Sequence, residues 1–416
     1  MKNIWKIIIA AFLLRILISF FGEHGDVISY YWWSKDLLAH GLLGFYDRNI
    51  ANAMRPTYPP VTSYLFFLSA YLHEIVFKIF WFLNIYIPTF PSNFIFWLES
   101  DHGWYIFNKL PAIFADMGII YIIYRFVRDI KNEKAALFAS VFYAFTPAFW
   151  YNSSLWGQTD SVFALPMIGA FYALFRGKIK TSLLLYGLAL LTKPTAAFVF
   201  PVYLIWLLRK VKFFDLLLGA SALIMEVIIL YLPFHPVNLL NWILLFYKRS
   251  LGGELGYMVA NAFNFWALIF GFDNRPDTSL FLGISANIVG YSAFAIIGIV
   301  VLYLFLKNKL DIKFTLLAAV VISFAAFIFL PRMHDRYFYL TLVMLVPLAA
   351  VDKKLRNVFW AASTIHLINL YHFWWVPRIG FLMDVFSNNL VEKTLIAMNI
   401  MLFGNVFLRL LRRQKI

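Results

Sequence analysis

Apolar stretches recur along the whole chain, and short polar or basic stretches separate them. An α-helix needs about 20 mainly apolar residues to cross the hydrocarbon core of a bilayer. The pattern predicts membrane spans near residues 4–21, 104–126, 135–152, 160–175, 181–191, 194–208, 213–234, 282–306, 314–330, 337–351, 358–376 and 391–409. It therefore indicates an all-α polytopic membrane protein with about 12 transmembrane helices in one membrane domain, 1–416.

Two of these segments, 181–191 and 194–208, are too short to cross a bilayer alone. The sequence Thr192-Lys193-Pro194 joins them, and a turn at membrane depth is tolerated only where protein or a hydrated cavity surrounds it. We expect a hairpin whose tip, with Lys193, stays within the protein. A lysine near the membrane interior needs a partner or an anionic ligand to offset its desolvation, so Lys193 is a candidate binding residue.

Two long segments, 22–103 and 235–280, interrupt the series of spans. The first must cross the membrane an even number of times if the basic loops stay inside. Its apolar part, 61–87, carries three ionisable residues and favours helices that lie along the outer surface without crossing. A pair of transmembrane helices is the alternative.

The charge distribution gives the expected orientation. The chain is 62% hydrophobic, 14% charged and has a mean hydropathy of +0.75, which is too apolar for a soluble core. The net charge of +15 could indicate a nucleic-acid partner, but basic residues in short loops between spans set membrane topology instead, so we expect none. The basic clusters are Arg125, Arg128, Lys131, Lys134; Arg176, Lys178, Lys180; Arg209, Lys210, Lys212; Lys307, Lys309, Lys313; Lys353, Lys354, Arg356; and Arg409, Arg412, Arg413, Lys415. All fall inside if the spans alternate, and the first span, which follows Lys2 and Lys6 without a cleavage site, is expected to remain as a signal anchor.

The first outer loop begins with two acidic residues directly after a span, Glu23 and Asp26. Removal of a proton from an alcohol needs a fixed carboxylate or imidazole, and a position beside a rigid helix end supplies that fixing. Asp26 could equally cap a helix that starts at Val27. The same loop carries Tyr58 in a Tyr-Pro-Pro element, another candidate binding residue.

A second polar element, Trp156-Gly157-Gln158-Thr159-Asp160-Ser161, joins two spans on the outer side. It would bring the indole of Trp156, the amide of Gln158 and the carboxylate of Asp160 to one cavity edge. Polar groups at a membrane edge indicate function by default, whereas Asp160 would also serve as the N-cap of the next helix.

A third element, Pro331-Arg332-Met333-His334-Asp335-Arg336-Tyr337, suits a phosphate. Arginine offers planar bidentate donors to phosphate oxygens, and a stacked Tyr337 or His334 can order such a site. The alternative is a cluster that faces lipid headgroups, but basic residues on the outer side run against the positive-inside rule. Lys109 could add charge.

Metal dependence is not predicted. The chain has no cysteine, no Asp-x-Asp pair, no Gly-rich phosphate loop and no histidines at ligand spacing. Asp116 and Glu226 lie within apolar spans, where helix packing is the favoured role.

The order of these motifs resembles the GT-C superfamily of membrane glycosyltransferases, which use polyprenyl-phosphate-linked sugars. The resemblance runs from about Trp5 to Tyr337 and includes the outer-loop acid, Tyr-Pro-Pro, Lys-Leu-Pro with Asp116, Trp-Gly-Gln-Thr-Asp, Thr-Lys-Pro and His-Asp-Arg-Tyr. It implies a GT-C-like core module over 1–234, with outer-face helices in loop 22–103, and variable C-terminal spans over 235–416 with outer loop 235–280.

The resemblance also implies an inverting transfer without a metal or other cofactor. The base maps to Asp26, with Glu23 as its neighbour; some relatives place the acid directly before Tyr-Pro-Pro, where this chain has Thr57. The sugar, with mannose preferred by family frequency, would pass from a polyprenyl- or dolichyl-phosphate donor to a hydroxyl of a lipid, glycan or protein. This would occur on the extracytoplasmic face of the cell membrane, or of the endoplasmic reticulum in a eukaryote.

Two other classes remain open from the sequence. A transporter or flippase for a lipid-linked saccharide would use the same cations to bind the headgroup, but the chain shows no internal repeat. A surface-polysaccharide polymerase or ligase would also be polytopic and would act outside.

Overall fold

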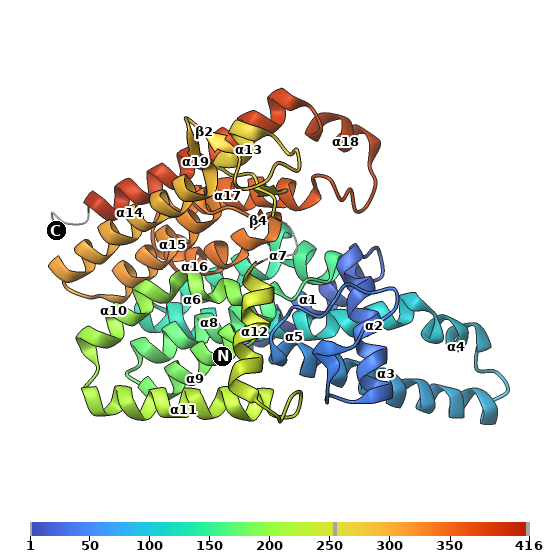
Figure 1. Ribbon diagram of the computed structural model, residues 1–416. Helices are drawn as coiled ribbons and strands as arrows, with labels where there is room; N and C mark the ends of the chain where they lie inside the picture. Colours follow the sequence, from blue (N-terminus) through green and yellow to red (C-terminus); the bar gives the residue numbers. More distant parts are fainter. Residues whose placement is uncertain (1, 253–255, 413–416) are drawn as a thin grey trace.

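The chain folds into a bundle of helices (Figure 1). The structure is a computed structural model that describes residues 2–252 and 256–412. Within these ranges it contains nineteen α-helices, which confirms the predicted helical fold class. Four strands of two residues each depart from the all-α prediction.

The elements of the first half are α1 (Lys2–Ser19), α2 (Gly25–His40), η1 (Phe45–Asp47), α3 (Pro60–Tyr86), α4 (Ser92–Glu99), α5 (Asp101–Ile130), α6 (Glu133–Phe145), α7 (Pro147–Trp150), the π-helix η2 (Tyr151–Trp156), α8 (Asp160–Phe175), α9 (Ile179–Leu190), η3 (Pro194–Val199), α10 (Phe200–Lys210) and α11 (Phe213–Tyr231). The helices of the second half are α12 (Leu239–Gly252), α13 (Phe265–Phe270), α14 (Ala286–Lys307), α15 (Ile312–Phe329), η4 (Asp335–Phe338), α16 (Tyr339–Val351), α17 (Lys353–Tyr371), α18 (Gly380–Phe386) and α19 (Asn389–Arg412). The strands are β1 (Val259–Ala260), β2 (Leu280–Phe281), β3 (Ile284–Ser285) and β4 (Met333–His334). β1 pairs with β4 in parallel, and β2 pairs with β3 in antiparallel orientation.

Six helices in the described ranges, α3, α5, α11, α14, α15 and α19, are long and apolar enough to cross a membrane. Five of them coincide with predicted spans, and α8 and α9 are apolar but shorter. The total of about 12 crossings stays a prediction.

The sixth candidate, α3, differs from the prediction. The sequence favoured several helices lying on the outer surface, whereas the structure has one continuous helix of 27 residues. Its ionisable residues interrupt the apolar pattern only locally, because the His73 side chain is 2% exposed and stacks on Trp104, with ring centroids 3.7 Å apart. Glu74 and Lys78 are then the only charged residues in α3.

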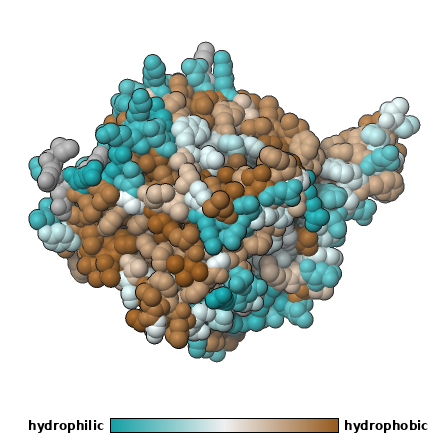
Figure 2. Space-filling model, turned by 90° about the horizontal axis from the view of Figure 1, so that it is seen from above, coloured by the Kyte–Doolittle hydropathy of each residue, from teal (hydrophilic) through white to brown (hydrophobic). Residues whose placement is uncertain are grey.

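The outside of the bundle is apolar, as expected for a protein whose solvent is lipid. Only 6% of the most apolar window of α11 is buried inside the protein. Exposed large apolar side chains also run along α14, including Ile288, Ile296 and Ile299. Figure 2 shows broad apolar surface on one face of the molecule, with polar residues gathered in separate patches.

The centre of the bundle is the helical hairpin α15–α16. Every residue of α15 from 314 to 328 and every residue of α16 from 339 to 350 is buried. A helix that is apolar all round belongs in the core, and this hairpin is packed against α5, α6, α8, α17 and α19. The turn between its two helices, which carries β4 and η4, is thereby held in a fixed position.

The long segment 22–103 is attached to the tip of the α9–α10 hairpin. The Val61 N–H donates to the Leu191 carbonyl at 3.0 Å, and the Thr62 hydroxyl donates to the Thr192 carbonyl at 2.9 Å. The predicted short hairpin is confirmed, and Lys193 at its tip is 2% exposed. These bonds bring the Tyr-Pro-Pro element beside Lys193.

Candidate active site

The start of α2 holds the candidate base. His24, not Asp26, is the N-cap of this helix, because the His24 Nδ1 accepts the Asp26 backbone N–H at 3.0 Å. The alternative that Asp26 is the cap is therefore wrong. Since the imidazole satisfies the helix end, the Asp26 carboxylate is available for other contacts.

Two side chains from distant parts of the chain contact that carboxylate. The Gln158 amide donates to Asp26 Oδ2, and Arg336 Nη2 lies 3.5 Å from the same oxygen. The Asp26 side chain retains 13% exposure. It is thus fixed in position and still reachable by a ligand.

Electrostatics keep Asp26 ionised. Burial alone would raise the pKa of Asp26, but the Arg336 guanidinium, the neighbouring His24 ring and the hydrogen bond from Gln158 outweigh burial and hold this pKa below its ordinary value. Burial lowers the pKa of His24 to about 4, against the opposing influence of Asp26. His24 is therefore neutral near pH 7, and its ring packs between the indoles of Trp156 and Trp374, with centroids 4.3 and 4.0 Å away.

The turn between α15 and α16 supplies the cation. Arg336 lies in η4, where Asp335 contacts it at 3.9 Å and Asp335 Oδ2 accepts the Trp374 indole N–H at 2.8 Å. Burial, together with the nearby Arg336 and Lys193 charges, lowers the pKa of His334 to about 3. His334 therefore offers hydrogen bonds rather than positive charge near neutral pH.

Arg332 is turned away from Asp26. Its Nε donates to Asp277 Oδ2 at 2.8 Å, and its backbone N–H donates to the Met258 carbonyl at 3.0 Å. Its φ of +60° takes the chain through the left-handed region immediately before β4. Arg332 therefore joins the segment around Asp277 to the turn, while Arg336 points to the site.

Lys193 forms the second polar group of the site. Its Nζ pairs with Asp160 Oδ1, and Asn152 Nδ2 donates to Asp160 Oδ2 at 3.0 Å. Asp160 begins α8, but Thr159 is the N-cap residue and makes no side-chain cap, so the capping role proposed for Asp160 is wrong. Lys193 Nζ also lies 5.6 and 5.7 Å from the ring centroids of Tyr58 and Tyr337.

Hydroxyl groups connect the Lys193 side of the site to Asp26. The Tyr30 hydroxyl donates to Gln158 Oε1 at 3.2 Å and lies 3.1 Å from the Tyr58 hydroxyl. Gln158, whose amide also binds Asp26, thus joins both halves. Of the predicted binding residues, Gln158 and Arg336 contact the Asp26 carboxylate, and Tyr58 is linked to Gln158 through the Tyr30 hydroxyl.

The π-helix η2 and the turn after it position the side chains of Trp156 and Gln158. Gly157 has φ +79°, and a Cβ atom there would lie 2.5 Å from Val27 Cγ2 and 3.0 Å from Lys109 Cγ. Only glycine fits such a close approach in this conformation. The turn brings Trp156 against His24 and Gln158 against Asp26, and π-helical segments of this kind are frequent at functional sites.

Glu23 and Lys109 line a different hollow, of about 410 Å³, beside the 19–22 turn. Glu23 Oε1 lies 3.7 Å from His102 Nδ1, and Lys109 Nζ donates to the carbonyls of Ser19 and Gly22. Of the two candidate bases, Asp26 alone contacts Arg336 in the described structure.

Several contributing residues were missed from the sequence. Tyr30, Asn152 and Trp374 complete the site, but each lies within an apolar or aromatic stretch with no distinctive spacing. Arg15 could have been found, because a charge within the first apolar span needs a partner. It donates from Nε to Asp116 Oδ2 at 2.5 Å.

The Arg15–Asp116 pair is structural. Hydroxyls of Tyr143, Ser153 and Tyr339 also donate to Asp116, at 2.6, 2.6 and 3.1 Å. The pair is fully buried and ties α1 to α5. It agrees with the packing role predicted for Asp116.

No group of three His, Asp or Glu residues in the described ranges could hold a metal ion. The arrangement instead offers an ionised carboxylate, a guanidinium and tyrosine hydroxyls at one end of a helical membrane bundle. These groups suit proton removal and stabilisation of an anion. The class that the fold and site define is a helical integral membrane protein with a buried polar site.

Part of the chain matches a known protein family. Residues 92–235 match the family model described as dolichyl-phosphate-mannose-protein mannosyltransferase. This match covers less than half of the chain and agrees with the predicted resemblance to the GT-C superfamily of membrane glycosyltransferases. The matched range runs from the start of α4 to just beyond α11.

Two further comparisons complete the findings. The fold is similar to a crystal structure of ArnT from Cupriavidus metallidurans in the apo state, with a TM-score of 0.40 and 14% identity over 97% of this chain and 76% of that chain. No curated protein matches the sequence.

Proposed function

We propose that the protein is an inverting glycosyltransferase that moves a sugar from a polyprenyl-phosphate donor to a hydroxyl acceptor, with Asp26 as the base. The observation that carries the proposal is the 3.5 Å contact between Arg336 Nη2 and Asp26 Oδ2. Asp26, which would remove the proton, and Arg336, which would stabilise the negative charge that develops on the phosphate, thereby lie side by side. The matching family model, named for mannosyltransferases, supports a lipid-linked donor and a preference for mannose.

In the reaction, Asp26 takes the proton of the acceptor hydroxyl. The acceptor oxygen forms a bond to the anomeric carbon of the sugar while the bond from that carbon to the phosphate oxygen breaks. The electron pair leaves with the lipid phosphate, and the proton remains on the Asp26 carboxyl. Attack opposite the leaving group inverts the anomeric configuration, and no metal or other cofactor takes part.

Arg336 would do more than receive the phosphate. In the unliganded protein its charge lowers the pKa of Asp26, which makes this carboxylate a weak base. When a donor phosphate binds Arg336, the phosphate offsets the guanidinium charge and Asp26 becomes more basic. Donor binding and base strength are therefore coupled.

Lys193 is a secondary cation, because Asp160 already balances its charge. His334 would donate a hydrogen bond to the phosphate or the sugar, and Tyr58 and Tyr337 would line the space between Lys193 and Arg336. Arg332 pairs with Asp277, so it would hold the turn in position and would not bind the phosphate.

The charge pattern supports an extracytoplasmic site. Basic residues lie in the last turns of four helices, at the end of the bundle away from Asp26. They are Arg128 of α5, Lys210 of α10, Lys307 of α14 and Arg409 of α19. The positive-inside rule assigns those ends to the cytoplasm. The junctions α1–α2 and α15–α16, which form the site, would then face outward.

The test uses purified protein in proteoliposomes with a polyprenyl-phosphate donor that carries labelled mannose or glucose, and membrane extract as the acceptor. We expect acceptor-dependent release of lipid phosphate and a labelled product of inverted configuration. A donor that moves between leaflets with its sugar bond intact would instead identify a flippase and refute the proposal. Full transfer by Asp26→Asn, with loss in Glu23→Gln, would refute the base assignment.

A further inference from the structure

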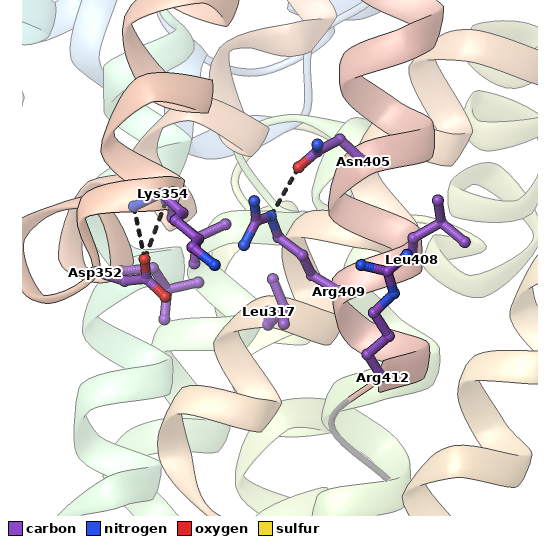
Figure 3. Close-up of a pocket in the computed structure, with 9 residues that line it drawn as sticks. Leu317, Asp352, Lys354, Asn405, Leu408, Arg409 and Arg412 are labelled. Atoms are coloured by element: carbon purple, nitrogen blue, oxygen red, sulfur yellow. Dashed lines mark hydrogen bonds between the residues drawn. The ribbon is translucent and has the colours of Figure 1, made fainter. Parts of the chain in front are cut away.

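A second hollow lies at the end of the bundle away from Asp26. It has a volume of about 430 Å³ and is lined by Leu317, Leu348, Asp352, Lys354, Leu355, Asn405, Leu408, Arg409 and Arg412 (Figure 3). These residues come from α15, the end of α16, the start of α17 and the end of α19. Because α15 ends at Phe329 and rises about 1.5 Å per residue, roughly 18 Å of helix separates Leu317 from the η4 turn.

Three cations converge on the hollow from two helices. Lys354 belongs to α17, and Arg409 and Arg412 belong to α19. Arg409 Nε donates to Asn405 Oδ1 at 2.7 Å, which orients its guanidinium and leaves the terminal nitrogens available (Figure 3). Within residues 2–252 and 256–412, no carboxylate lies within ion-pair distance of any of the three.

The one carboxylate in the lining has another task. Asp352 Oδ1 accepts the backbone N–H groups of Lys354 and Leu355 at 2.8 and 3.3 Å, and so caps α17. A capping carboxylate is partly neutralised by the helix end that it binds. The hollow therefore has a surplus of positive charge.

The remaining walls are apolar and consist of Leu317, Leu348, Leu355 and Leu408. Leu408 is 50% exposed on the outside of α19, so the apolar wall continues toward the lipid-facing surface. Basic residues that only set topology need no shared hollow, whereas cations beside apolar walls at a helix end match an amphiphile with an anionic head.

We propose that this hollow binds the phosphate headgroup of an anionic phospholipid in the cytoplasmic leaflet. The arginines would donate bidentate hydrogen bonds to phosphate oxygens, Lys354 would add a point charge, and the leucines would contact the glycerol and the first acyl carbons. Arg413 and Lys415, which belong to the same basic cluster of the sequence, lie outside the described residues. The proposal does not depend on the glycosyltransferase reaction.

The test is native mass spectrometry of delipidated full-length protein titrated with phosphatidylglycerol or phosphatidylcholine. The double variant Lys354→Gln/Arg409→Gln removes two cations from the hollow. The control Lys210→Gln/Lys353→Gln removes the same charge from exposed basic positions on the same side, outside the lining. Each interfacial cation contributes about a fivefold gain in affinity, so we expect the double variant to bind phosphatidylglycerol about 25-fold more weakly. The control should stay within about twofold of the wild type, because exposed charges that do not contact the bound lipid contribute little.

Equal weakening in the variant and the control would overturn the proposal, because binding would then reflect overall charge. Inorganic phosphate at millimolar concentration should not displace the lipid; complete displacement would identify a free-phosphate site and refute the lipid. Hydrogen exchange of the wild-type protein gives a readout that needs no variant. Phosphatidylglycerol should slow exchange at 352–356 and 405–412, and the absence of any slowing there would also refute the proposal.

Discussion

Arg336 Nη2 lies 3.5 Å from Asp26 Oδ2, although one residue comes from the start of α2 and the other from the turn before α16. The contact joins the long segment 22–103 to the central hairpin of the bundle. Its two partners have opposite tasks in the proposed reaction, since one removes a proton and the other stabilises an anion.

Substitution Asp26→Asn should reduce transfer by about 10²- to 10⁴-fold, because the amide cannot accept the acceptor's proton. The control is Asp36→Asn on the same helix, whose carboxylate pairs with Arg48 at 2.7 Å and does not contact the site. Initial rates with saturating donor would be compared for both variants. Comparable losses in both would mean that the effect comes from disturbance of α2.

The acid limb of the pH–rate profile should move when Arg336 is replaced. Transfer needs ionised Asp26, so activity is present above the pKa of this residue and is lost as the pH falls through it. Arg336 helps to hold this pKa below the ordinary value of 3.8, and Arg336→Gln should therefore shift the acid limb to higher pH as well as slow transfer. Arg332→Gln, whose parent side chain pairs with Asp277, should leave the limb unmoved. An unchanged acid limb in Arg336→Gln would show that Arg336 does not lower the pKa of Asp26.

Breaking the Arg15–Asp116 pair should destabilise the protein by about 3–5 kcal/mol, because Asp116→Leu leaves a buried charge on Arg15. The double variant Arg15→Met/Asp116→Leu removes both charges and should recover most of this loss. Thermal unfolding in detergent would measure both. A double variant less stable than the single one would show that the hydroxyls around Asp116 need its charge.

Gly157→Ala should lower both stability and transfer. A left-handed φ costs an alanine about 1–2 kcal/mol, and the clash with Val27 adds about 1–3 kcal/mol and displaces Gln158. Gly177→Ala is a matched control, since Gly177 has φ +69° but nothing within 4 Å of a Cβ atom. The difference between the two variants measures the effect of the contact between a Cβ atom at position 157 and Val27. Equal unfolding temperatures and equal transfer rates in the two variants would show that this contact has no effect.

Helix positions were predicted well because apolar length is a local property of the chain. The predicted span 160–175 has the limits of α8, and 213–234 differs from α11 by three residues at one end. The tip at Lys193 followed from the same reasoning, because two short apolar segments cannot each cross a bilayer. The single helix α3 was missed because the orientation of His73 depends on Trp104, which lies on another helix.

The contacts of the candidate site were less predictable, because they depend on tertiary structure. Asp26 and Asp160 both stand where an N-cap is expected, yet His24 caps one helix and Lys193 engages the other carboxylate. Arg332 and Arg336 have the same side chain in one motif, but the left-handed turn at Arg332 sends them to different partners.

The late position of Arg336 in the chain has a consequence for biosynthesis. A ribosome that has released Asp26 into the translocon must still synthesise α3 to α15 before the guanidinium appears. A chain that terminates before Arg336 would carry the carboxylate without the guanidinium, so such a partial product would lack one of the two groups that the proposed reaction needs. In the proposed reaction, both groups would therefore be present only after about four fifths of the polypeptide has been synthesised.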